Sequence, residues 1–155
     1  MVILALDLSS VKTGWSVIEN GILKDFGEII LSKFKSKKNP REYLEILYQS
    51  INDLITQFTP STVCVEDTFC RNVLTLKSLS KVRGIAELCV SENKINSFLT
   101  YTPSEARKKV FGKGNITKEE ACVILSSKLN IALLTDGFDI SDSIVIGFCC
   151  WENIK

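Results

Sequence analysis

The sequence predicts an α/β fold with one mixed β-sheet and helices on both of its faces. Three strand-like segments follow one another at the N-terminus, and two later strand-like segments alternate with segments of helical periodicity. Strands joined by tight turns pair antiparallel and strands joined through helices pair parallel, so the sheet is expected to be mixed. With 155 residues, of which 45% are hydrophobic, the chain is expected to form a single domain over residues 1–155.

Each expected element has a local signal. Residues 2–8 form an almost continuous apolar run, which is typical of a strand buried on both faces. Asn20-Gly21 is a favoured hairpin turn between strands at 14–19 and 22–31. The other expected elements are a helix from Pro40 to about Phe58, a strand at 61–66, a helix at 72–92, a strand at 98–101, a short helix opening at Thr102, and helices at 117–129 and 139–151.

The composition excludes several classes of function. The chain has no histidine, which rules out Ser-His-Asp and Cys-His triads and zinc sites that need imidazole. Residues 1–7 lack the basic leader of a signal peptide, and no stretch approaches the ~18 apolar residues that indicate a membrane span. None of the six cysteines forms a C-x-x-C pair, so we expect buried, reduced thiols in a reducing cytosol.

The net charge of +1 conceals a marked pattern along the chain. Basic residues dominate 32–41, 70–83 and 105–118, whereas 119–155 holds six acidic residues against two basic ones. One basic segment is most often a solvated face. Three of them beside an acidic part indicate a positive surface around a negative pocket, as in a protein that holds a polyanion and binds a cation.

Four carboxylates are expected to converge at one edge of the sheet. Asp7 and Glu66 each end an apolar strand, which places them at the carboxyl edge where α/β proteins bind ligands. Asp139 and Asp142 are spaced i, i+3 and project from one face of the last helix. Such a cluster repels itself unless cations neutralise it. Sites made only of carboxylates suit Mg²⁺ or Mn²⁺, and two such ions are the usual means of attack on a phosphodiester.

Simpler interpretations of these acids stay open. Asp139 could N-cap its helix, with Asp142 as a favourable first-turn acid. Either strand-end acid could instead begin a loop, and Asp67 and Asp136 are rival candidates. We expect Asp136 to lie in a loop and Asp67 to point away from its neighbour in the strand.

Five segments carry a further signal: ILALDLSSVKTGWSVI at 3–18, VEDTF at 65–69, LSKVRG at 79–84, the basic stretch 107–118 with two glycines, and DISD at 139–142. In this order they resemble the RuvC-type Holliday junction resolvases of the ribonuclease H-like superfamily. The resemblance covers about residues 1–151. Each match alone is weak, and the ordered set of five is specific. Leu8-Ser9 replaces the family's usual Pro-Gly, and Arg107 stands where a lysine is usual.

The resemblance implies a ribonuclease H-like fold with a five-stranded sheet and a metal-dependent nuclease site. The expected catalytic and metal-binding residues are Asp7, Glu66, Asp139 and Asp142, which would hold two Mg²⁺ ions, with Mn²⁺ as a substitute. Phe69 would stack at the strand exchange, and Arg107 and Lys118 would hold the backbone at the cut. The residues expected to contact DNA are Phe69, Arg71, Lys77, Lys81, Arg107, Lys113 and Lys118.

The implied activity is resolution of four-way DNA junctions by paired nicks that leave 5′-phosphate and 3′-hydroxyl ends. The resemblance also implies a homodimer, and a location in the cytoplasm of a bacterial cell or a phage-infected host. The 72–92 helix is the expected dimer contact, with Leu76, Leu79, Val82 and Ile85 as its apolar surface. The alternative is that this helix packs only on its own sheet.

Other functions remain open at this point. A related nuclease on the same fold could act on RNA or on other branched DNA, and a binding protein could hold junctions without cutting them. The full acid set argues against a protein that only binds junctions, because carboxylates near phosphates weaken DNA binding. Asp7-Leu8-Ser9-Ser10 near Gly14 also suggests an actin-like sugar kinase, but the chain is too short for two lobes.

Overall fold

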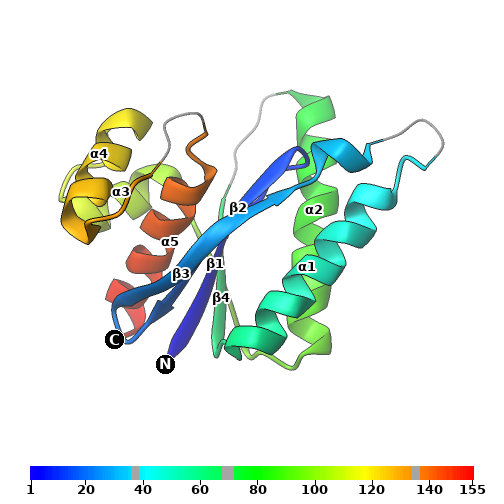
Figure 1. Ribbon diagram of the computed structural model, residues 1–155, viewed down its shortest axis with the longest axis horizontal. Helices are drawn as coiled ribbons and strands as arrows, with labels where there is room; N and C mark the ends of the chain where they lie inside the picture. The colour runs from blue at the N-terminus through cyan, green and yellow to red at the C-terminus, as the bar shows by residue number, and fades with distance from the viewer. Residues whose placement is uncertain (36–38, 68–71, 134–136) are drawn as a thin grey trace.

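A five-stranded mixed sheet forms the centre of the computed structural model, which describes residues 1–35, 39–67, 72–133 and 137–155. Its spatial order is β3-β2-β1-β4-β5, and Figure 1 shows it between two groups of helices. The first three strands pair antiparallel, and β4 and β5 continue the sheet in parallel. The mixed sheet is confirmed. The strands are β1 (Val2–Asp7), β2 (Lys12–Glu19), β3 (Ile22–Ile30), β4 (Thr62–Glu66) and β5 (Ser97–Tyr101).

The turn between β2 and β3 has the geometry that its sequence predicts. Asn20 and Gly21 have φ values of 50° and 81°, as a hairpin turn with two left-handed residues requires. The turn starts the antiparallel pairing of β2 with β3, and a register shift between Val17 and Ile18 then brings Gly14 of β2 opposite Glu28 of β3. The register determines which charged side chains lie beside the candidate site.

Helices cover both faces of the sheet, as expected. On one face lie the short 3₁₀ turn η1 (Ser32–Phe34), α1 (Glu42–Phe58) and α2 (Val73–Glu92). On the other face α5 (Asp139–Ile154) packs against β1, β2 and β4. The remaining helices, α3 (Pro103–Phe111) and α4 (Lys118–Leu129), contact α5 and form an outer layer (Figure 1). The element order matches the sequence prediction, although α1 begins two residues after Pro40 and α5 extends three residues beyond Trp151.

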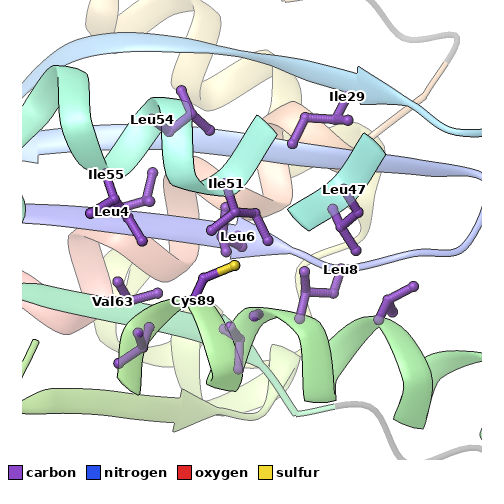
Figure 2. Close-up of a cluster of buried hydrophobic side chains, with 14 of the residues drawn as sticks. Leu4, Leu6, Leu8, Ile29, Leu47, Ile51, Leu54, Ile55, Val63 and Cys89 are labelled. Carbon is purple, nitrogen blue, oxygen red and sulfur yellow. The ribbon is translucent and has the colours of Figure 1, made fainter. Parts of the chain in front are cut away.

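Two hydrophobic cores lie on the opposite faces of the sheet. Figure 2 shows the core beneath α1 and α2, where Leu4 and Leu6 of β1 meet Leu47 and Ile51 of α1. The neighbouring β1 residues, such as Ala5, point the other way into the core under α5. Residues 3–6 are fully buried, which explains why the segment is apolar at consecutive positions. The end of β1 is therefore held rigidly from both sides.

The cysteines contribute to these cores as small apolar side chains. Among the described residues, the buried cysteines are Cys64, Cys89, Cys122, Cys149 and Cys150. Cys70 lies outside the described residues. Within the described part of the chain, no helix combines the length and apolar character needed to cross a bilayer.

Candidate active site

Asp7 and Glu66 lie side by side at the carboxyl ends of β1 and β4. The two strands are parallel neighbours, and Leu6 pairs with Val65 immediately before the two acids. Strand alternation gives Asp7 the same face as Ala5, which packs in the core under α5. Each acid is the last residue of its strand, so neither begins a loop. The sequence prediction that these two carboxylates share one sheet edge is confirmed by this geometry.

The first turn of α5 brings two more carboxylates to the same edge. Asp139 is the first residue of the helix, and its N-cap is Phe138, which makes no side-chain capping bond. Asp139 is therefore not the N-cap, which removes one of the simpler interpretations. Asp142 is one turn further on and is only 2% exposed. A buried carboxylate is costly unless it is paired, so Asp142 needs a partner.

Gly14 determines how closely α5 approaches the sheet. It pairs with Asp7 across β1 and β2. A Cβ atom built on Gly14 would overlap the backbone carbonyl of Asp139. The absence of a side chain at this one position lets the start of α5 contact β2 directly, and so sets Asp139 beside Asp7.

The carboxylates perturb one another electrostatically. Burial, followed by the charges of Glu66 and of the two α5 aspartates, raises the pKa of Asp7 well above its usual range. Burial and then the charge of Asp142 raise the pKa of Glu66 to about 7, against the opposing effects of Lys118 and Arg107. Four acids in mutual repulsion at one sheet edge are stable only with positive charge nearby. Such clusters of perturbed groups mark candidate functional sites.

Cations from α3 and α4 neutralise Asp142. Lys118 Nζ bonds its Oδ2, and Arg107 Nη2 lies 3.5 Å from its Oδ1. Arg107 also donates to the carbonyl of Ile116, at 3.3 Å, which fixes the loop before α4. Capping boxes at Thr102 and Thr117 define where α3 and α4 begin. The two residues expected to hold a DNA phosphate therefore contact the acid cluster itself.

The donor set fits a hard divalent cation. Every candidate ligand is a carboxylate, an oxygen donor of the kind that hard divalent cations prefer. Within residues 1–35, 39–67, 72–133 and 137–155, no three acidic or thiol side chains are already gathered around one point. Asp139 and Asp142 are instead engaged in ion pairs. The chemistry of the ligands suits Mg²⁺, and a cation that binds Asp142 would replace its contact with Lys118.

The other residues expected to contact DNA differ in how far the structure describes them. Phe69 and Arg71 lie outside the described residues, as does the rival acid Asp136. Lys77 and Lys81 are exposed on α2. Lys113 is exposed in the loop between α3 and α4, close in sequence to the site residue Lys118.

Asp67, the remaining rival acid, points away from the cluster. It is exposed and lies 3.3 Å from Arg83 of α2. Arg83 also pairs with Glu87, at 2.9 Å, and donates to the Thr100 hydroxyl. These contacts agree with the expectation that Asp67 faces away from Glu66.

The apolar surface expected on α2 needs a correction. Val82 is fully buried in the core and cannot contribute to an interface, while Leu79 and Ile85 are partly buried against the same core. Helical spacing alone did not separate core from surface, because α2 carries apolar residues around much of its circumference. The exposed large apolar residues of α2 are Val73, Leu74, Leu76 and Leu88.

Sequence reasoning missed Lys12 and Glu28. Lys12 Nζ lies 2.9 Å from Glu28 Oε2 and 3.4 Å from Asp139 Oδ2. The hydrogen bond with Glu28 is the main cause that raises the pKa of Lys12, so the side chain is a cation. Strand alternation could have pointed to Glu28, because it places this residue on the same face of β3 as Phe26, which packs in the core under α5.

Comparison with known proteins gives one consistent result. A family model described as "Crossover junction endodeoxyribonuclease RuvC" matches residues 3–150. The RuvC protein of Chlorobium phaeovibrioides is 27% identical over 152 residues, which cover 96% of this chain and 80% of that relative. That of Natranaerobius thermophilus is 26% identical over 151 residues, covering 96% and 93%. The structure of Thermus thermophilus RuvC in complex with a Holliday junction substrate matches with a TM-score of 0.81 and 16% identity, covering 98% of this chain and 93% of that one.

The mixed five-stranded sheet with helices on both faces is a ribonuclease H-like fold. The chain belongs to the crossover junction endodeoxyribonuclease RuvC family, because the family model spans nearly all of it. Members of this family are metal-dependent nucleases that act on DNA junctions. The family expected from the five sequence segments is confirmed.

Proposed function

We propose that residues 1–155 act as one nuclease domain that resolves four-way DNA junctions, using the carboxylates at the ends of β1 and β4 and at the start of α5. The observation that carries the proposal is the position of Asp7. Its carboxylate is partly buried at a sheet edge, and the charges of three acidic neighbours act on it. No structural role needs such a group, whereas a cation site does.

Two Mg²⁺ ions, or Mn²⁺ in their place, would supply an activated water and stabilise the leaving 3′ oxygen when bound. Asp7, which lies between Glu66 on one side and the α5 aspartates on the other, would be the central ligand of this site. Glu66, Asp139 and Asp142 complete the ligand set. The products expected are a 5′-phosphate and a 3′-hydroxyl.

Lys118 and Arg107 orient the scissile phosphate in this proposal. Both reach Asp142, so their charges lie at the rim of the acid cluster. The Lys118 side chain is 47% exposed and can turn from Asp142 to a phosphate oxygen, while Arg107 is held more deeply. Contacts of this kind position the backbone without reading the sequence. Lys77, Lys81, Lys113 and Arg71 would attract the junction arms, and Phe69 would stack at the strand exchange.

A homodimer would supply two acid sites for the two opposed cuts that a two-fold symmetric junction requires. The exposed apolar residues at the start of α2, Val73, Leu74 and Leu76, support this helix as the contact. Cys64, Cys89, Cys149 and Cys150 are buried free thiols, which fit the cytoplasm of a bacterial cell or of a phage-infected host.

The test is a cleavage panel with a labelled four-way junction, a Y-fork, a linear duplex and an RNA–DNA hybrid, each with and without Mg²⁺. Junction cleavage that needs Mg²⁺ and exceeds cleavage of the other substrates supports the proposal. Preferential cutting of the fork or of the hybrid would assign the same fold to another nuclease activity. Tight junction binding with no cleavage in Mg²⁺ or Mn²⁺ would identify a binding protein instead.

A further inference from the structure

A chain of three charged side chains runs from the edge of the sheet to the start of α5. Glu28 of β3 holds Lys12 of β2 at 2.9 Å, and Lys12 in turn reaches Asp139 Oδ2 at 3.4 Å. All three side chains are about one-quarter to one-third exposed, which places the chain at the rim of the site. None of the roles assigned above uses Lys12 or Glu28.

The sheet register explains why these residues meet. Glu28 pairs with Gly14, and Gly14 pairs with Asp7, so Glu28 and Asp7 lie in one row across three strands. Residues paired in this way point to the same face of the sheet, which here is the α5 face. Since Gly14 has no side chain, the first residue of α5 occupies the space between them. Glu28 can therefore hold Lys12 against Asp139.

Gly137, two residues before α5 begins, packs directly on the ion pair. A Cβ atom on Gly137 would overlap Lys12 Nζ and would lie 3.2 Å from Asp139 Oδ2. Glycine at this position thus lets the end of the Lys12 side chain reach the carboxylate. The pair is bordered by β2, β3 and the start of α5, and these contacts restrict the orientation of the Asp139 side chain.

We infer that Lys12, anchored by Glu28, is a positioning residue that holds the Asp139 carboxylate in its metal-binding orientation. The inference rests on the proposed function, because it takes Asp139 as a metal ligand. The ion pair engages Oδ2 of Asp139, which leaves Oδ1 outside the pair. Partners that orient a ligand in this way typically change metal affinity by about 10–100-fold when they are removed.

We expect Lys12 and Glu28 to favour metal binding by orienting the Asp139 carboxylate and not by changing the charge of the site. Lys12 and Glu28 carry opposite charges, so together they add no net charge to the acid cluster. A lysine without an anchor would compete with a metal ion for Asp139. Lys12 lies closer to Glu28 than to Asp139, and this anchor leaves the carboxylate oriented but available.

The experiment separates orientation from charge with the double variant Lys12→Met/Glu28→Gln, which keeps the net charge of the chain. Binding of Mn²⁺ and Mg²⁺ to the DNA-free protein is measured as the metal concentration that gives half of the metal-dependent rise in melting temperature. We expect this concentration to rise about tenfold or more in the double variant. Lys12→Arg, which keeps the cation, should stay close to the wild type.

Two further variants control for folding. Glu19→Gln/Lys24→Met removes a 3.0 Å ion pair between the same two strands at the other end of the hairpin, and should leave metal affinity unchanged. Gly137→Ala keeps every charge but displaces the Lys12 ammonium, so it should weaken metal binding in the same direction as the double variant. It provides the test if the double variant does not fold.

The outcomes are distinguishable. Wild-type affinity in the double variant, or tighter binding, would overturn the inference while leaving the metal site in place. Equal weakening in the Glu19/Lys24 control would also overturn it, by showing a general effect on the hairpin. A wild-type protein whose melting temperature does not respond to either metal would overturn the proposed function together with the inference.

Discussion

Gly14 and Asp139 are in backbone contact, with no space for a side chain between them. Gly14 is also the β2 partner of Asp7. One glycine therefore sets the separation between the strand that carries Asp7 and the helix that carries Asp139 and Asp142. The acid cluster depends on this close approach as much as on the acids themselves.

Replacing Gly14 with alanine should separate α5 from β2. We expect Gly14→Ala to cost about 1–3 kcal/mol of unfolding free energy, as overpacking typically does, and to reduce junction cleavage more than it reduces folding. The matched control is Gly84→Ala on α2, where an added Cβ meets nothing within 4 Å. That variant should gain roughly 0.5–1 kcal/mol from helix propensity. For both variants, urea denaturation measures the unfolding free energy and a junction cleavage assay measures the activity. A Gly14→Ala protein with wild-type cleavage would show that the contact does not set the site.

The metal-free protein should lose stability as the pH rises from about 4 to about 7. The pKa of Glu66 is raised to about 7 in the folded protein, against an ordinary value of ~4.3, and the pKa of Asp7 is raised as well. In this window the folded state holds protons that the unfolded state has released, so increasing pH favours unfolding. Asp7→Asn should therefore melt at a higher temperature than the wild type at pH 7.5 in EDTA.

Thermal melts from pH 4.5 to 8 check this prediction, and Mg²⁺ should restore stability at the upper end. Glu45→Gln, which changes an exposed acid on α1, is the matched control and should follow the wild-type curve. A metal-free protein that becomes more stable across this pH range would contradict the assignment of the acids as a mutually repelling cluster.

Lys118→Met should weaken junction binding by a similar factor for all sequences. The side chain is placed to meet a phosphate, so the slope of log K against log salt should fall by about 1. Binding is measured in Ca²⁺, which screens the acids but suits the site less well than Mg²⁺ and should not support cleavage. Lys128→Met, at the opposite end of α4, is the control. An unchanged slope for Lys118→Met would remove the phosphate contact from the account.

The proposed dimer depends on leucines at the start of α2. Leu74 is 76% exposed and Leu76 is 45% exposed. Leu74→Ser/Leu76→Ser should convert a dimer into a monomer, because it removes apolar surface without touching the core. Val123→Ser on α4, at a residue that is 64% exposed, should leave the dimer intact. Light scattering at micromolar concentration measures whether each protein is a dimer or a monomer. A monomeric wild type would contradict the proposed dimer. A double variant that stays dimeric would place the dimer contact elsewhere.

The sequence predicts the sheet and its acid ends well, because both follow from local patterns. Asp7 could be placed at a strand end because residues 3–6 are apolar at successive positions. The Lys12–Glu28 pair could not be predicted from the sequence. It depends on the register of the β2–β3 hairpin and on the position of the start of α5 against β2. Val82 was assigned to a surface for a related reason. The periodicity of α2 shows which residues are apolar, but only packing shows which of them face α1 and the sheet.

The most direct measurement of the central claim is the cutting of a supercoiled plasmid that extrudes a cruciform, by the wild type and by Asp7→Asn in Mg²⁺. Paired cuts across the four-way junction convert the plasmid into a linear product, with nicks at symmetric positions on opposite strands. Asp7→Asn should retain junction binding but lose cleavage by more than about 100-fold, the upper range for residues that only support a ligand. Near wild-type cutting by Asp7→Asn, or nicked circles without linear product from the wild type, would contradict the account.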